Sequence, residues 1–210
     1  MALKHWVTIT LAVFAAIGLT SGCRSASPAT SFYTLTAVVP APGSVIGNDT
    51  APPPAIIGIG PVSVPRMLNR AQIVTRATPN RVTMDDFHRW AGDLEDNFLH
   101  VLTENLAALV APHPVRAFPW EALDAPRYRV AVTVHRLDGS LEDSVVMDVI
   151  WDITDIEAGK QILSKRSVVN EAVEKPDYES FVAAQSRAIG VLSKEMADAL
   201  NALIQKGIQP

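Results

Sequence analysis

Cysteine is almost absent from this chain, because Cys23 is the only one among 210 residues. A single cysteine cannot form an internal disulfide or build a cysteine-based zinc site. The histidines after residue 23 do not help, since no two of them have the spacing that would place both imidazoles on one metal. They are His88, His100, His113 and His135. The sequence therefore predicts no metal site and no cofactor.

Signatures of enzymatic chemistry are also lacking. No serine lies in a Gly-x-Ser-x-Gly turn, which is the usual position of a hydrolase nucleophile. Gly58 and Gly60 suggest a phosphate-binding loop, but Pro61 follows them and there is neither a third glycine nor a helix start. The chain has 18 basic and 22 acidic residues, a formal charge of −4, which argues against a nucleic-acid partner. We expect a protein that is not an enzyme.

The first 22 residues have the organisation of a secretory signal. Lys4 precedes an apolar run from Trp6 to Leu19, and small residues follow. The run has about 14 residues, whereas a membrane-spanning helix needs about 20. Small residues directly before Cys23 resemble a bacterial lipobox, although Leu19 lies four residues before the cysteine and Thr20 occupies the position more often filled by leucine.

We therefore predict that residues 1–22 are a lipoprotein signal peptide and that Cys23 becomes the acylated first residue, carrying a thioether-linked lipid and a fatty acid such as palmitate. The alternatives are a soluble cleaved precursor or an uncleaved N-terminal anchor. Arg24, rather than aspartate, follows the cysteine, as is usual for sorting to the outer membrane. The acylated cysteine and a short tether would occupy residues 23–31, of which Arg24 to Ser31 span at most about 28 Å.

The remaining chain is long enough for one domain, which we place at residues 32–207. Alternating apolar residues and turn signals predict strands over several segments. These are 31–39, 55–65, two strands within 71–84 around a turn at 78–80, and a meander of 128–137, 144–154 and 161–173. A Pro/Gly-rich loop covers 40–55.

Two helices are expected. Thr83 and Asp86 have capping-box spacing, and apolar residues recur at helical intervals over 85–110, with a bend expected at Gly92. Asp177 is expected to cap a second long helix that ends near Gly207. The predicted fold class is α+β: an antiparallel β-meander sheet with two long amphipathic helices packed on one face. Trp90 and Trp151 are interpreted as core residues, and the other sheet face would meet solvent or a partner.

One segment is basic although the chain is acidic. Arg66, Arg70, Arg76 and Arg81 lie within sixteen residues. Such a strip of arginines can bind carboxylates or lipid phosphates. Alternatively, these arginines pair with the acidic segment 85–96 of the same domain.

Several segments, in order, resemble the PqiC (YmbA) type of lipoprotein, the auxiliary component of ABC-type transport systems. They are "FYTL", "VPRMLNRAQIVTR", "FHRWAGDLEDNFLHVLTENLAAL" and "PW" at 119–120, and with the meander and final helix they cover about residues 32–204. The resemblance implies a non-catalytic lipoprotein on the periplasmic side of the outer membrane of a Gram-negative bacterium. It implies work with an MCE-domain protein of the PqiB type in lipid trafficking and membrane integrity, and assembly into a ring around an MCE tube. Arg70, Arg76, His88 and Trp90 are its signature positions.

Two functions remain open at this point. The first is an adaptor that docks the transport protein at the membrane, with partner contacts expected at Arg66, Arg70, Arg76, His88 and Trp90. The second is a carrier that itself holds a phospholipid or other hydrophobic ligand between sheet and helices. A periplasmic hydrolase has only scattered His, Ser and Asp residues in its favour.

Overall fold

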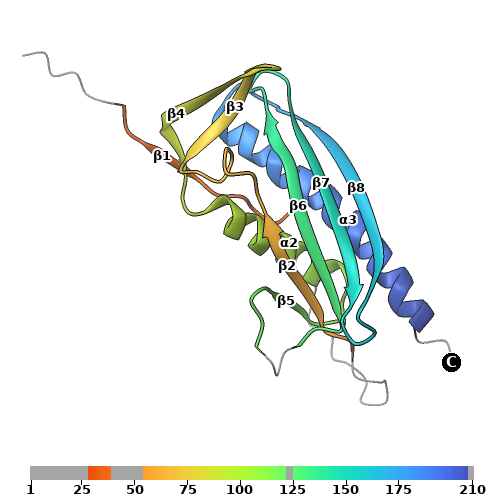
Figure 1. Ribbon diagram of the computed structural model, residues 1–210. Coiled ribbons are helices and arrows are strands. Elements are labelled where there is room, and N and C mark those ends of the chain that lie inside the picture. Colours follow the sequence, from red (N-terminus) through yellow and green to blue (C-terminus); the bar gives the residue numbers. More distant parts are fainter. Residues whose placement is uncertain (1–27, 39–53, 122–124, 208–210) are drawn as a thin grey trace, which may run out of the picture.

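The computed structural model describes residues 28–38, 54–121 and 125–207, and it has an α+β architecture (Figure 1). Cys23, the predicted signal peptide and most of the predicted 40–55 loop lie outside the described residues. Within the described part, the strands form a five-stranded sheet in the order β5-β2-β6-β7-β8 and a three-stranded sheet in the order β1-β4-β3.

The five-stranded sheet contains the predicted meander. Strands β6 (Tyr128–Gly139), β7 (Ser144–Asp155) and β8 (Lys160–Ala172) pair antiparallel in sequence order. Strand β2 (Ile57–Ser63) joins β6 in parallel, and the short β5 (Val115–Ala117) joins β2 in parallel. The sheet is therefore mixed rather than purely antiparallel. Hairpins join β6, β7 and β8, whereas long connections separate β2, β5 and β6 in the sequence and allow them to pair in parallel.

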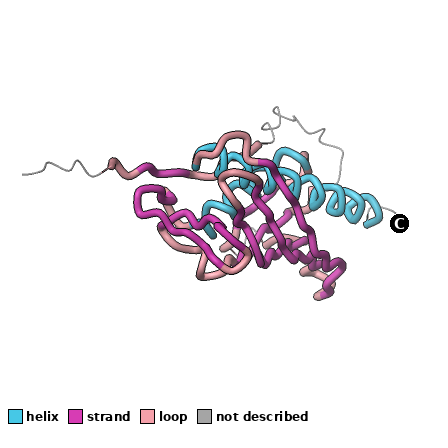
Figure 2. Tube along the Cα trace, turned by 90° about the horizontal axis from the view of Figure 1, so that it is seen from above, coloured by secondary structure: helices cyan, strands magenta, loops and turns pink. Residues whose placement is uncertain are grey.

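Helices α2 (Leu94–Leu109) and α3 (Tyr178–Gly207) pack against each other and against the five-stranded sheet, α3 over β7 and β8 and α2 over β2 and β5. Figure 2 shows the helices on one side of the strands. Asp177 caps α3 as expected, since the Ser180 amide donates to its Oδ1 at 2.7 Å. Neither of these two helices combines the length and the apolar run that crossing a bilayer would require.

Alternating residues of the meander build the core between sheet and helices. The large side chains that are completely buried there include Trp151, Met147 and Ile153 from β7, Phe98 and Leu102 from α2, and Phe181 from α3. Trp151 and Trp90, with 0% and 5% exposure, are core residues as the sequence predicted. This burial is the main stabilising term of the fold.

The predicted helix over 85–110 begins nine residues late. Residues up to Trp90 belong to strand β4 (Arg81–Trp90), which lies between β1 (Ser31–Tyr33) and β3 (Gln72–Thr78). Helix α2 starts only after Gly92 and Asp93. The capping-box interpretation of Thr83 and Asp86 was wrong, because pairing with two neighbouring strands outweighs the local helical pattern.

The predicted strand over 31–39 is shorter in the structure, where β1 ends at Tyr33. Residues beyond it lie on the two helices instead. The Thr36 amide donates to Ser186 Oγ at 3.2 Å, and the Val38 amide donates to Asn105 Oδ1 at 3.1 Å. A side chain at Gly190 would collide with Val38, so the glycine lets this segment approach α3 closely.

Gly58 and Gly60, which suggested a phosphate loop, have a packing role. A Cβ on Gly58 would lie 2.6 Å from Cγ of Pro126 and 3.0 Å from Trp120, and one on Gly60 would lie 2.6 Å from Cβ of Phe118. Gly60 also has φ of 118°, which disfavours other residues. Strand β2 thus accepts Phe118, Trp120 and Pro126 directly against its backbone.

Candidate functional site

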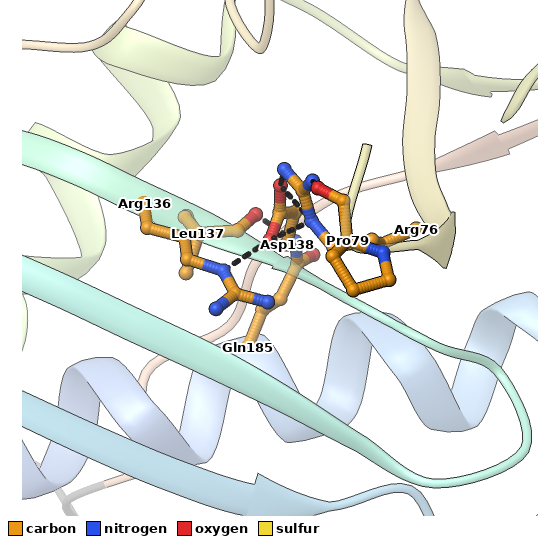
Figure 3. A network of polar contacts seen from close by, with 6 residues as sticks. All are labelled: Arg76, Pro79, Arg136, Leu137, Asp138 and Gln185. Carbon is orange, nitrogen blue, oxygen red and sulfur yellow. Dashed lines mark hydrogen bonds and ion pairs between the residues drawn. The ribbon is translucent and has the colours of Figure 1, made fainter. Parts of the chain in front are cut away.

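The arginine-rich segment contributes to a cleft where two hairpins meet. The β3–β4 hairpin lies beside the turn between β6 and β7, and Arg76 from β3 reaches Asp138 near the end of β6 (Figure 3). The neighbouring Arg136 binds the same carboxylate. The sequence had left Asp138 just beyond the predicted strand 128–137, with no expected role.

Asp138 is almost completely buried, with 1% of its side chain exposed, and its carboxylate is held by two guanidinium groups. Arg76 Nε donates to both oxygens at 3.1 and 3.2 Å, Arg76 Nη2 also contacts Oδ2, and Arg136 Nε donates to Oδ1 at 2.6 Å. Burial alone would raise the pKa of Asp138, but the hydrogen bonds from Arg76 and Arg136 outweigh it and lower the pKa below its ordinary value. Asp138 is therefore an ionised structural anchor.

The strand that carries Asp138 is also fixed from below. Gln185 of α3 donates its side-chain amide to the Leu137 carbonyl at 3.1 Å, as Figure 3 shows. On the other side, Arg76 Nη1 donates to the Pro79 carbonyl at 2.8 Å. The buried carboxylate thus connects the small sheet to the large sheet, and α3 supports it.

Beside this network lies an open cleft of about 540 Å³. Its wall includes both arginines, the hydroxyl-bearing Thr78, Ser140 and Ser144, and Asp143. The Ser144 hydroxyl is engaged with Asp143 Oδ2 at 3.1 Å. With two guanidinium groups, one carboxylate and three hydroxyl groups in its lining, the cleft can make hydrogen bonds and ion pairs.

His88 belongs to a second cluster, between the small sheet and the start of α3. Its ring stacks on Tyr178 with centroids 3.9 Å apart, and its Nδ1 lies 2.7 Å from the hydroxyl of Tyr33. Burial is the main reason that the pKa of Tyr178 is raised, with the nearby Asp85 adding to the effect and a hydrogen bond with Thr75 opposing it. His88 is half-buried and contributes packing between two elements.

The residues that the sequence singled out do not form one site. Arg66 and Arg70 are exposed, and Arg70 donates to Gln72 Oε1 at 3.1 Å and to the Met84 sulfur at 2.7 Å. Arg76 is held by Asp138, which lies outside the acidic segment 85–96 that the alternative interpretation had proposed as its partner. Trp90 is buried.

The outer face of the five-stranded sheet, opposite the helices, is polar with isolated apolar side chains. Arg166 of β8 and Asp148 of β7 form a two-point ion pair, with Nε to Oδ1 at 2.8 Å and Nη2 to Oδ2 at 2.6 Å. Next to this pair, Ile150 is 38% and Val168 is 62% exposed. This face can therefore meet either water or a protein partner.

Among the residues that the structure describes, no three His, Cys, Asp or Glu side chains gather into a group able to hold a metal ion. The network around Asp138 and the cluster around His88 are both explained by contacts between elements.

Comparison with known proteins identifies the family. No curated protein sequence matches the chain. A crystal structure of an uncharacterized protein superposes with a TM-score of 0.67 at 17% identity, covering 82% of this chain and 99% of the other. Protein XCC0632 from Xanthomonas campestris superposes with a TM-score of 0.65 at 16% identity, covering 86% and 100%. At these identities the two structures establish the fold.

The family described as the ABC-type transport auxiliary lipoprotein component matches residues 33–197, which is most of the described chain. The matched region contains both helices' starting residues, the complete meander and the Asp138 network. The resemblance to PqiC/YmbA-type lipoproteins is confirmed, and the chain belongs to the family of ABC-type transport auxiliary lipoprotein components.

Proposed function

We propose that this protein is a non-catalytic adaptor, anchored through Cys23 in the outer membrane and facing the periplasm, that docks an MCE-domain transport protein of the PqiB type. The family match over residues 33–197 carries the proposal. In this role residues 32–207 act as one domain, and the transport system moves lipid between membranes. Assembly of several copies into a ring would let them surround the partner.

The packing of the interior favours an adaptor over a lipid carrier. A carrier would hold its ligand between the sheet and the helices, but this space is filled by side chains. Trp151, Phe98 and Phe181 each have 0% exposure there. The clefts that the described surface offers are instead open and lined by polar and apolar groups alike.

The proposed partner surface includes the outer face of the five-stranded sheet, where Ile150 and Val168 are exposed beside a fixed ion pair. Arg66 and Arg76 are the arginines we assign to protein contact, Arg66 because it is exposed and Arg76 because it lines the cleft beside Asp138. His88 and Trp90 lie in strand β4 of the small sheet, where His88 stacks on Tyr178 and Trp90 is buried, so they would affect partner binding only through the packing of that sheet. A partner with complementary acidic and apolar groups fits these features.

The anchor is tested with the substitution Cys23→Ala. The matched control is Ser25→Ala, which changes a neighbouring residue but leaves the cysteine in place. We expect the C23A protein to be folded but absent from the outer-membrane fraction, because a single lost acylation site removes all of the lipid chains. Fractionation, combined with incorporation of a fatty-acid probe, measures both effects. Membrane retention of C23A, or no probe on the parent protein, would contradict the anchor.

The adaptor role is tested by capture from detergent-solubilised membranes with the acylated protein as bait. We expect an MCE-domain protein to be recovered, and an Arg66→Glu variant to recover less of it. Native mass spectrometry of the purified protein distinguishes the carrier, because a bound phospholipid that is not covalently attached would add its own mass. Such an adduct at full occupancy would reject the adaptor in favour of the carrier.

A further inference from the structure

The three-stranded sheet has a face turned away from α3. Part of this face is covered, since Val74 is buried and Arg76 reaches Asp138 of the large sheet, and the rest of it carries exposed side chains. His88 of β4 points toward α3, because its ring stacks on Tyr178 at the start of that helix. Tyr33 of β1 points the same way, because its hydroxyl lies within hydrogen-bond distance of His88. Side chains alternate along strands, so Phe32 and Arg89, which pair in register, point the opposite way. Phe87, on the other side of His88, is also exposed.

Further residues extend this face along β3 and β4. Gln72 pairs in register with Arg89, and Arg70 binds both Gln72 and the sulfur of Met84. We call this surface the small-sheet outer face and define it by six residues: Phe32, Arg70, Gln72, Met84, Phe87 and Arg89. Phe32, Met84 and Phe87 are 65%, 40% and 39% exposed, which is unusual for such large apolar side chains when they lie close together.

The charge of this part of the chain is opposite to that of the whole. Residues 64–93 contain five arginines and three aspartates, a net charge of +2, although the full chain has a net charge of −4. Asp86, which lies next to the face, accepts a hydrogen bond from Gln72 Nε2 at 3.0 Å. Arginine and exposed apolar groups together are the combination that an anionic lipid surface attracts.

The described chain begins beside the small sheet. It starts at Pro28 and enters β1 at the end of the molecule formed by the small sheet, whereas helix α3 ends at the other end (Figure 1). Nine residues lead from Cys23 to Phe32, a span of at most about 32 Å. If Cys23 carries the lipid anchor, the small sheet is the part of the domain held nearest to the bilayer.

We infer that the small-sheet outer face lies on the phospholipid surface of the membrane that holds Cys23. Phe32, Met84 and Phe87 enter the headgroup region, while Arg70 and Arg89 meet lipid phosphates. This contact rests on the proposed anchor and adds to it, because it fixes how the domain is turned. The outer face of the five-stranded sheet is then left available to the protein partner.

A single introduced thiol tests the contact. Met84→Cys places a thiol on the face, and Ile162→Cys, with a similar native exposure of 38%, places one near the β7–β8 turn at the other end of the molecule (Figure 1). Each mature protein is labelled with a polarity-sensitive fluorophore and reconstituted into vesicles of three parts phosphatidylethanolamine and one part phosphatidylglycerol. The parent protein, treated in the same way, measures any labelling of Cys23.

We expect the label at position 84 to shift to shorter wavelength and to be quenched by lipids brominated in their acyl chains, and the label at 162 to do neither. Arg89→Glu reverses one charge on the face. Since each charge near such a surface changes partitioning about fivefold, R89E should lower the ratio of shielded to exposed label at 84 roughly twentyfold. Salt at about 1 M should lower it without any substitution.

Equal behaviour of the two labels would overturn the inference. The inference would also be overturned if the label at position 84 were shielded from water in native membranes but not in these vesicles. A membrane protein, rather than lipid, would then cover the face. The intact mass of the same samples reports acylation separately. If the label at 84 is shielded on a protein without acyl chains, the membrane contact is supported and the lipid anchor is rejected. If the protein is acylated and the label stays exposed to water, the anchor is supported and the membrane contact is rejected.

Discussion

Replacing Asp138 by asparagine tests whether the buried carboxylate holds the two sheets together. Asparagine keeps the size of the side chain, so no cavity forms, but it removes the charge that both Arg76 and Arg136 contact. Taking away one partner of a buried ion pair costs about 3–5 kcal/mol. The two arginine side chains are 23% and 38% exposed, so water can partly hydrate them. We therefore expect D138N to lower the free energy of unfolding by about 2–3 kcal/mol.

The matched control is Asp148→Asn on the outer face of the large sheet. Asp148 also forms a two-point ion pair with an arginine, but Arg166 is 65% exposed there. Exposed pairs contribute little to stability, because water and salt screen them. Urea unfolding followed by fluorescence of the buried Trp151 should therefore show a midpoint lowered by about 1 M for D138N, and a much smaller change for D148N.

The pH dependence provides an independent check. Because the pKa of Asp138 is lower in the folded than in the unfolded protein, its contribution is fully present above the unfolded value of about 3.9. It is lost as the pH falls through the folded value. The stability difference between the parent protein and D138N should stay constant from about pH 7 to 5 and shrink below about 4. Equal effects of D138N and D148N, or a difference that persists in acid, would refute the reasoning.

Two further predictions concern packing between elements. Gly190→Ala adds a methyl group where Val38 lies and should destabilise the protein by about 1–3 kcal/mol, whereas Gly92→Ala meets nothing within 4 Å and should leave the melting temperature nearly unchanged. His88→Phe keeps an aromatic ring stacked on Tyr178, whereas His88→Ala removes it. In denaturant unfolding, the free energy of unfolding of H88F should therefore be about 1 kcal/mol higher than that of H88A. Equal losses within either pair would show that the assigned contact does not contribute.

The meander and the second helix could be predicted from the sequence because their patterns are local and long. Strands β6, β7 and β8 run over 12 or 13 residues each, and short turns at residues 140–143 and 156–159 separate them. Asp177 marks the start of α3 by a side-chain hydrogen bond within one turn. Such features need no knowledge of distant segments.

Strand β4 and the role of Arg76 could not be predicted in this way. The pattern of residues 85–90 also suits a helix. These residues form a strand because they pair with β1, which lies more than fifty residues away in the sequence. Arg76 finds Asp138 at a separation of 62 residues, where the sequence had suggested the acidic segment beside it. Only the folded chain determines which charges meet.

Composition and local pattern by themselves determined that this chain has the residues of a meander and a long final helix, a lone cysteine after an apolar N-terminal run, and an arginine-rich segment in an acidic protein. The tertiary structure decided that Arg76 is held by a buried carboxylate, whereas Arg70 is exposed and Arg89 is half-buried. The physical reason is that backbone propensity and hydrophobic period act over a few residues, whereas ion pairing depends on distances that exist only after the sheets have packed.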